Sequence, residues 1–169
     1  VGDGVASFGD FNSLEEAAAH LPPEGGELCL LPGLHRANLV LDGARNVAIH
    51  GCERRSFVLP RDAALAQPIL QCIDCDGIRV HGLDLVTYDA MAVHVLGRSE
   101  GSCRDVRIHD NRMIARTNCI RAENAAELVI AGNRLHLLDT ADGRATISLQ
   151  ADDCLVERNE LVLMPFIDT

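Results

Sequence analysis

The stretch VRIHDNRMI, residues 106–114, alternates apolar and polar side chains and then places Asn111 inside the run. Alternation with a period of two is typical of a β-strand, with Val106 and Ile108 on the face opposite to their polar neighbours. The segment recurs, and its other copies occupy residues 46–52, 77–85, 127–135 and 153–161. Recurrence at this interval predicts a solenoid, in which each copy packs on the next.

Two further strands accompany each copy. Apolar segments precede the copies at residues 39–41, 70–72, 93–95, 120–122 and 147–149, and others follow around Leu85, Met113, Leu135 and Leu161. Because three short strands recur without a helix between them, we expect an all-β parallel β-helix solenoid of about five to six coils. Neighbouring coils would then pair through the backbone at about 4.7–4.9 Å.

The position of Asn111 in the repeat is taken in order by Cys52, Leu83, Asn111, Asn133 and Asn159. An amide at a tight turn can bond backbone groups that the bend leaves unpaired, and stacked amides can bond one another. The sequence therefore predicts an asparagine ladder in the C-terminal half of the solenoid only.

A short helix is predicted ahead of the repeats, over residues 13–21. Asn12 or Ser13 would cap it, a glutamate three positions later would complete a capping box, and the Pro22–Pro23 pair would end it. We expect this helix to cover the first coil of a single domain, residues 1–169, whose coils run from about residue 27 to about residue 165. Residues 26–36 are expected to form the first strand. At the far end, residues 164–167 fold across the opening, or the chain is an excerpt and continues, or two molecules meet there.

The composition limits the classes of binding partner and the cellular compartment that we expect for the protein. A net charge of −10 argues against nucleic acid and against an anionic membrane surface. The seven cysteines are an odd number without the spacing of a disulfide scaffold, so we expect reduced, mostly structural thiols. Free thiols and the lack of a visible signal peptide favour the cytoplasm or an assembled particle.

The entry segment 1–36 and the repeats VRIHDNRM, LVIAGNRL and CLVERNEL resemble the right-handed parallel β-helix proteins of the pectate-lyase-like group. The resemblance spans nearly the whole chain and implies the fold, including its right-handed winding. It is a poor guide to function, because the architecture serves lyases, hydrolases, epimerases, phage tailspikes and non-catalytic modules alike.

The resemblance also implies a binding face. In enzymes of the group the substrate lies along the strand that precedes the Asn-turn strand, with the adjoining loops. Carried onto this chain, the candidate binding residues are Gln71, His94, Arg121, Ser148, Asp89 and Glu123. If the protein is an enzyme, a polysaccharide lyase is favoured over a glycoside hydrolase, with Arg121 and His94 as catalytic residues and Ca²⁺ held by acidic side chains.

Three histidines form a second pattern, because His50, His81 and His109 occupy the same outward position in successive copies. Such a column is a weak candidate for a metal site, and no third ligand follows on the next rungs. Stacking of like residues is also what repeat duplication produces, so we expect no metal and no cofactor.

Weaker signals complete the sequence. Cys72 and Cys75 form a lone Cys-x-x-Cys that core packing explains, and the ladder of Asp84, Arg112, Arg134 and Glu160 predicts cross-strand charge pairs. The longest turn, residues 97–105, is the candidate specificity loop or a tolerated insertion.

The absence of catalytic acid pairs and the small number of coils favour a non-catalytic β-helix module, structural or ligand-binding. Its partner would be a polysaccharide or a protein, within a tailspike-like or phage-tail-like assembly, and we also weigh end-to-end or lateral self-association. The alternative is the carbohydrate-active enzyme described above. The chain lacks Trp and has one Tyr, which counts against strong sugar stacking and shifts weight toward a structural or protein-binding role.

Overall fold

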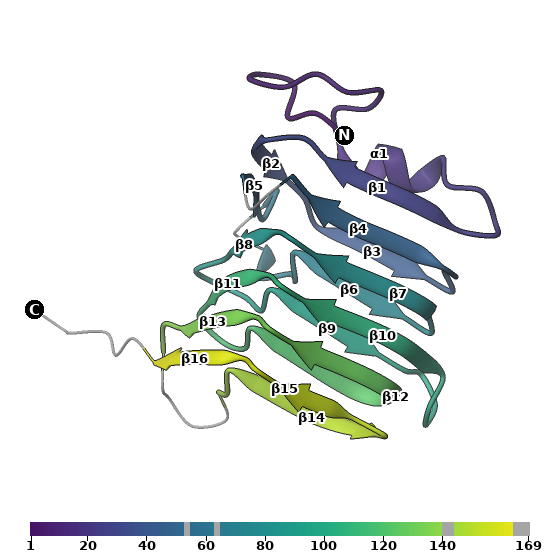
Figure 1. Cartoon of the computed structure of the whole chain (residues 1–169), viewed down its shortest axis with the longest axis vertical. Helices are drawn as coiled ribbons and strands as arrows, with labels where there is room; N and C mark the ends of the chain where they lie inside the picture. Colours follow the sequence, from purple (N-terminus) through teal and green to yellow (C-terminus); the bar gives the residue numbers. More distant parts are fainter. Residues whose placement is uncertain (53–54, 63–64, 140–143, 164–169) are drawn as a thin grey trace, which may run out of the picture.

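The computed structural model describes residues 1–52, 55–62, 65–139 and 144–163, and it shows a parallel β-solenoid of about five turns. Every strand pairing is parallel, as predicted from the repeat. The coils are stacked along the long axis of the molecule, from the N-terminus at one end to β14, β15 and β16 at the other (Figure 1). The all-β solenoid predicted from the sequence is therefore confirmed.

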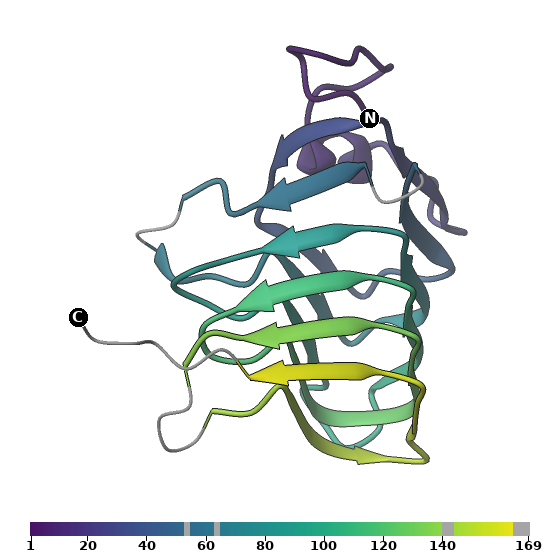
Figure 2. The same ribbon diagram turned by 60° about the vertical axis from the view of Figure 1, so that its left-hand side comes forward.

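The strands form three stacks along the axis. The β9 stack consists of β3 (Leu39–Asp42), β6 (Leu70–Ile73), β9 (Val93–Leu96), the first part of β12 (Ile120–Ala131) and β14 (Ile147–Asp152). The β10 stack consists of β1 (Gly26–Leu30), β4 (Val47–Gly51), β7 (Asp76–His81), β10 (Cys103–His109), the second part of β12 and β15 (Leu155–Glu157). The β11 stack consists of β2 (Gly33–Arg36), β5 (Ser56–Leu59), β8 (Asp84–Val86), β11 (Arg112–Ala115), β13 (Arg134–Leu137) and β16 (Glu160–Leu163), as Figure 2 shows.

Two strand boundaries differ from the sequence prediction. The segment 26–36, expected to be one strand, divides into β1 and β2 around Pro32. Conversely, β12 is one continuous strand where two were expected, and a register shift between Glu123 and Ala125 absorbs the bend. Asn124 within this shift has a φ of 51°, a left-handed conformation that asparagine tolerates better than most residues.

The core is a set of aliphatic columns that run through the coils. In the β10 stack, Leu28, Ile49, Val80, Ile108, Ile130 and Val156 are stacked in register. The first five are buried, and each stabilises the fold by about 1.5–3 kcal/mol relative to full exposure. Val156, on the last described rung, is 45 % exposed, because among the described strands none pairs beyond β15.

The turn between the β10 and β11 stacks explains why asparagine interrupts the repeat. The residue before it is left-handed in four coils, with φ values of 68°, 55°, 64° and 51° at Gly82, Asp110, Gly132 and Arg158. This bend leaves the next backbone N–H without a strand partner, and the amide of the following coil accepts from it. The N–H groups of Leu83, Asn111 and Asn133 donate to the Oδ1 atoms of Asn111, Asn133 and Asn159 at 3.1, 3.0 and 2.9 Å.

A serine serves the turn nearer the N-terminus, where the sequence has Cys52 in place of asparagine. The Cys52 N–H donates to the hydroxyl of Ser56 at 3.1 Å, and this hydroxyl donates to the carbonyl of Leu30 at 2.8 Å. Ser56 is fully buried. A hydroxyl on the next strand thus satisfies the same kind of backbone groups that the amides satisfy in later coils.

Helix α1 (Leu14–Ala19) covers the first coil, within the predicted range of 13–21 (Figure 1). Ser13 caps it by accepting from the Glu16 N–H at 3.1 Å. With Ser13 as the cap, the capping-box position is Glu16, and among the described residues no hydrogen bond runs from its side chain back to the Ser13 N–H. Glu15, one residue earlier, fixes the helix to the first coil, because its carboxylate accepts from the Asn38 N–H at 2.9 Å and pairs with Arg61 at 2.5 Å.

The opposite end of the solenoid exposes apolar side chains of its last coil, Leu149, Val156, Leu161 and Leu163. The segment 164–167, one of the predicted covers for this end, lies outside the described residues, as does the predicted end of the coils near residue 165. No helix in the described part of the chain is long and apolar enough to cross a bilayer.

Candidate functional site

The β9 stack places four of the predicted binding residues in one column on its outer face. Gln71 on β6 pairs with His94 on β9, His94 pairs with Arg121 on β12, and Arg121 pairs with Ser148 on β14. Val40 on β3 extends the column by one rung. The parallel register alone brings these residues together, because one residue from each coil occupies each rung position.

A chain of hydrogen bonds joins the middle of this column. The Gln71 amide nitrogen lies 3.2 Å from Nδ1 of His94, and Nε2 of His94 lies 2.9 Å from Oε2 of Glu123. Oε1 of Glu123 accepts from an Nη atom of Arg121 at 2.7 Å. Glu123 stands two positions beyond Arg121 on β12, so the contact with His94 runs diagonally between neighbouring strands.

These contacts assign the proton on the imidazole. The Gln71 amide nitrogen can only donate, so Nδ1 of His94 accepts, and Nε2 carries the hydrogen that it donates to Glu123. The His94 side chain is only 12 % exposed. Both nitrogens are therefore occupied, and neither is free to take a proton from a ligand without breaking a bond within the chain.

The charge on Glu123 is held in place by the same contacts. The Arg121 guanidinium, followed by the His94 hydrogen bond, holds the pKa of the Glu123 carboxyl below its ordinary value. The carboxylate thus stays ionised near neutral pH and orients Arg121, whose side chain remains 42 % exposed. This arrangement suits Arg121 to contact a ligand as a fixed cation, with Glu123 as its support.

The remaining predicted binding residues lie apart from the chain of hydrogen bonds. Ser148 lies on β14, on the rung after Arg121, and is half-buried. Gln150, also on β14, is paired in register with Glu123 on β12. Asp89 is exposed in the turn between β8 and β9, and within the described ranges no hydrogen bond or ion pair joins it to the cluster. The structure therefore brings together Gln71, His94, Arg121, Glu123 and Ser148 but not Asp89.

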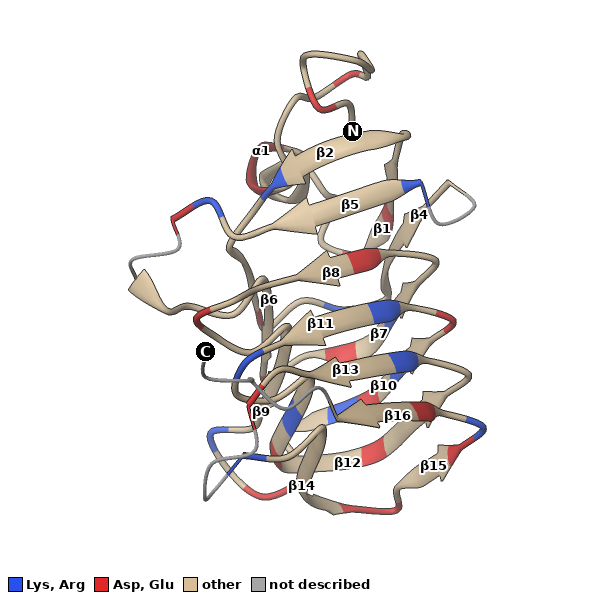
Figure 3. Ribbon diagram, turned by 90° about the vertical axis from the view of Figure 1, so that its left-hand side faces the viewer, with Lys and Arg blue, Asp and Glu red and all other residues tan. Residues whose placement is uncertain are grey.

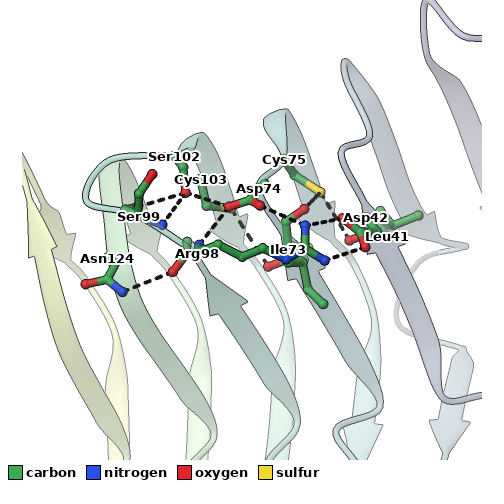
Figure 4. A network of polar contacts seen from close by, with 12 residues as sticks. Leu41, Asp42, Ile73, Asp74, Cys75, Arg98, Ser99, Ser102, Cys103 and Asn124 are labelled. Carbon is green, nitrogen blue, oxygen red and sulfur yellow. Dashed lines mark hydrogen bonds and ion pairs between the residues drawn. The ribbon is translucent and has the colours of Figure 1, made fainter.

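A polar network that the sequence did not predict lies at the edge of this face (Figure 4). Arg98 donates to both carboxylate oxygens of Asp42 at 2.8 and 2.6 Å and to Asp74 at 2.8 Å. The Ser102 hydroxyl also donates to Asp74, at 2.5 Å. Arg98 holds the pKa of the Asp42 carboxyl below its ordinary value.

The candidate specificity loop, predicted over residues 97–105, is shorter in the structure, because β10 begins at Cys103 and leaves residues 97–102 as the turn. The network fastens this turn across three coils. Asn124 adds a bond from its amide to the carbonyl of Gly97 at 3.0 Å. The signal in the sequence was an acidic residue near the end of each of two strands, Asp42 and Asp74, with Arg98 at the corresponding place one coil later. Residues so far apart in sequence could be connected only after the register was known.

The three candidate histidines are stacked as predicted from their repeat positions. The rings of His50 and His81 are 5.2 Å apart, those of His81 and His109 are 4.8 Å apart, and each pair is within 8° of parallel. Nε2 of His50 lies 2.6 Å from Oε1 of Glu27, an ion-pair contact rather than a directed hydrogen bond. Burial, followed by the neighbouring His109 and His50, lowers the pKa of His81 below its ordinary value.

Two further observations concern metal binding and the hollows in the surface. Over the described ranges, no three His, Cys, Asp or Glu side chains are placed to hold one metal ion. A hollow of about 700 Å³ lies at the N-terminal end beside Asp3, Arg36 and Arg61, away from both the His94 cluster and the histidine column. The His94 cluster itself lies on the outer face of the β9 stack.

No family model, no curated protein and no solved structure matches this chain. What it does must therefore be argued from the fold and from the geometry of these side chains.

Proposed function

We propose that this chain is a non-catalytic β-solenoid module that binds an extended polar ligand along the outer face of the β9 stack. The ligand would lie parallel to the solenoid axis, across Gln71, His94, Arg121 and Ser148, and would be a polysaccharide or an extended segment of a protein. Arg121 is the main contact, because it is the exposed cation of the column and has a fixed orientation.

One observation carries this proposal. Every acid–base group of the His94 cluster is already engaged: both nitrogens of His94 and both oxygens of Glu123 have partners within the cluster. A general base needs a free lone pair within reach of the substrate, and a general acid needs a proton to give. The ionised carboxylate of Glu123 and the imidazole of His94 each make two hydrogen bonds within the cluster. This arrangement is suited to hold Arg121 in place and is poorly suited to proton transfer.

The wider setting is also proposed. The parallel solenoid supports assignment to the right-handed, pectate-lyase-like type, because parallel crossovers are almost always right-handed. A role within a larger assembly, such as a tailspike-like particle, is supported by the last coil. That coil presents the exposed apolar side chains of Leu161 and Leu163 beside strand edges that have no partner strand within residues 1–163 as described.

The test is a binding panel of neutral glycans, polyuronates and extended peptides, measured by calorimetry for the wild type and for Arg121→Gln. The proposal predicts a ligand whose affinity falls about tenfold or more in Arg121→Gln, as expected when a charge-assisted contact is lost. Arg112→Gln is the matched control, because Arg112 is an exposed arginine on the β11 stack and its loss changes the net charge equally. Equal losses in both variants would contradict binding at this face.

The same panel decides the enzymatic alternative. Incubation with polyuronates, with and without Ca²⁺, would release unsaturated products if the protein were a lyase. Product formation that Arg121→Gln abolishes would overturn the non-catalytic proposal, since it would make Arg121 the base rather than a binding cation.

A further inference from the structure

The outer face of the β10 stack carries a strip of positive and ionisable side chains on a protein whose net charge is −10. Arg79 on β7 and Arg107 on β10 are paired in register, and His81 and His109 are paired two positions further along the same strands. His50 on β4 extends the histidine column by one rung. We call Arg79, Arg107, His50, His81 and His109 the basic strip.

The strip places like charges directly opposite each other. Neighbouring strands are about 4.8 Å apart, and like charges at directly opposed positions destabilise a sheet. Arg79 is exposed, and no described carboxylate forms an ion pair with it. The ion pair between Arg107 and Asp105 uses Nε of Arg107, at 3.0 Å, and not its two Nη groups.

The other pair of stacked arginines shows the contrast. Arg112 and Arg134 are also in register, on β11 and β13, but carboxylates occupy both ends of their ladder. Arg134 lies 3.2 Å from Glu160, and Arg112 is paired in register with Asp84. Figure 3 shows this order at the start of the strands, with acidic residues in red on β8 and β16 and basic residues in blue on β11 and β13 between them. The basic strip lacks such carboxylates on the rungs next to its arginines, where Ala48 and Val129 stand instead.

Those small residues leave space for a ligand beside the guanidinium groups. A hollow of about 490 Å³ is lined by three cationic or ionisable side chains, two carboxylates and three small or apolar residues: Arg107, His109, Arg158, Asp110, Glu157, Val129, Ala131 and Gly132. Asp110 is already engaged with His109, whose Nδ1 lies 3.0 Å from its Oδ2. A smaller hollow, of about 60 Å³, lies beside Arg79 and Ala48. The fold therefore presents two arginines next to open space on one face: Arg79, which has no ion pair with a described carboxylate, and Arg107, whose ion pair with Asp105 uses Nε alone.

We propose that the basic strip is an anion-binding site for an acidic glycan, whose sulfate or carboxylate groups bridge Arg79 and Arg107 and extend along the histidine column. Guanidinium groups bind such oxyanions through paired N–H donors. A linear glycan advances by about one rung per ring, so that successive charges meet successive coils. In an extended peptide, the side chains on one face recur about every 6.6–6.8 Å. This interval does not match the spacing of about 4.8 Å between neighbouring strands of the solenoid.

Nucleic acid fits the strip less well. Its affinity comes from neutralising many phosphates at once, and the strip has two permanent cations on a chain of net charge −10. A short acidic glycan needs to contact the strip alone.

The histidines make the site sensitive to pH. The charged or titratable groups that face the column are Glu27 and Cys29 from β1, Arg79 from β7, Arg107 from β10, Asp110 from the following turn, Glu157 from β15 and Cys52 after β4. Protonation of the imidazoles adds positive charge beside the two arginines, so an anion should bind more tightly as the pH falls.

The experiment uses three polymers with one backbone: dextran sulfate, carboxymethyl-dextran and neutral dextran, titrated into the full chain. We expect at least one charged polymer to bind, the neutral polymer not to bind, and Arg79→Gln/Arg107→Gln to weaken binding about tenfold or more. Which charged polymer binds more tightly assigns sulfate or carboxylate. Arg112→Gln/Arg134→Gln is the control double variant, with the same change in net charge, and should bind as the wild type does.

The pH arm uses dextran sulfate, because sulfate does not titrate between about pH 8 and about pH 5.5, where histidine does. Affinity should rise across this range in the wild type and stay level in His50→Gln/His81→Gln/His109→Gln. His81→Gln alone is a second variant in case the triple variant folds poorly, and should lose part of the rise.

Four results would overturn the proposal: no binding of either charged polymer, equal weakening in both double-arginine variants, free sulfate binding as tightly as the polymer, or a single-stranded oligonucleotide binding more tightly than both glycans. The basic strip is tested by Arg79→Gln/Arg107→Gln and the β9-stack proposal by Arg121→Gln, which change different faces of the solenoid. The failure of one proposal can therefore be distinguished from the failure of the other.

Discussion

Nε2 of His94 lies 2.9 Å from Oε2 of Glu123, although the two residues belong to different coils and stand diagonally on neighbouring strands. The contact depends on the parallel register of β9 and β12, since a shift of one residue would turn either side chain toward the core. Together with the Arg121 guanidinium, which is the larger influence, it holds Glu123 ionised, and it places the imidazole hydrogen on Nε2 of His94.

The titration of Glu123 reports the contact directly. Its pKa should lie below the ordinary value of 4.5, because Arg121 and then His94 stabilise the carboxylate. The folded state is therefore favoured above pH 4.5, and this contribution is lost as the pH falls through the lowered pKa. Carboxyl-detected NMR should show the pKa of Glu123 rising toward 4.5 in Arg121→Gln; an unchanged pKa would mean that Arg121 does not hold the carboxylate.

Asn133 should be the most sensitive of the stacked amides. It is 1 % exposed, its Oδ1 accepts from the Asn111 N–H at 3.0 Å, and its amide donates to the Ile108 carbonyl at 2.8 Å. Asn133→Ala leaves both buried groups unpaired, so the free energy of unfolding should fall by about 2–4 kcal/mol. Urea unfolding measures it, with exposed Asn12→Ala as a control expected within about 0.5 kcal/mol of wild type.

His81 should titrate below its ordinary value of 6.5, chiefly because of burial and then because of His109 and His50. The unfolded chain therefore binds more protons below pH 6.5, and stability should fall as the pH drops through 6.5 toward the lowered pKa. In His109→Gln, NMR should show the pKa of His81 rising but remaining below 6.5, since the burial is retained. A pKa at or above 6.5 in the wild type would contradict the stacked column.

The cysteines should differ in their reactivity according to how deeply each thiol is buried. Burial raises the pKa of Cys119 to about 12 and that of Cys103 to about 11, whereas Cys154 is exposed. Because the thiolate is the reactive form, a short iodoacetamide pulse should label Cys154 first. Peptide mass mapping should find Cys72, Cys75, Cys103 and Cys119 labelled only after unfolding. Labelling of Cys119 in the folded protein at the rate of Cys154 would show that the core is open.

The solenoid could be predicted because its determinants are local and repeated. Apolar alternation identified the strands, and aligning Val106 with Ile78 and Leu128 gave the register that the structure shows. The columns at His94 and His81 follow from that register alone. Their roles in binding stay predictions, because repetition specifies where a side chain stands and not what it contacts in a ligand.

The contacts that depend on long side chains could not be predicted. Arg98 reaches Asp42, 56 positions away, and Arg61 reaches Glu15, 46 positions away. Each depends on rotamers and loop paths that no repeat encodes. The substitution of Ser56 for the missing amide was also hidden, because the hydroxyl comes from the following strand and not from the repeat position itself.

The most direct test of this account is disulfide trapping at the His94 column, because the binding face exists only if His94 and Arg121 are rung partners. Their Cα atoms should be separated by about the 4.8 Å spacing between strands, within the range that a disulfide spans. His94→Cys/Arg121→Cys should therefore form the 94–121 disulfide under mild oxidation, as shown by peptide mapping. His94→Cys/Glu123→Cys, whose Cα atoms should lie beyond the limit of about 7 Å, should not. Equal or greater cross-linking of the 94–123 pair would contradict the register and the face built on it.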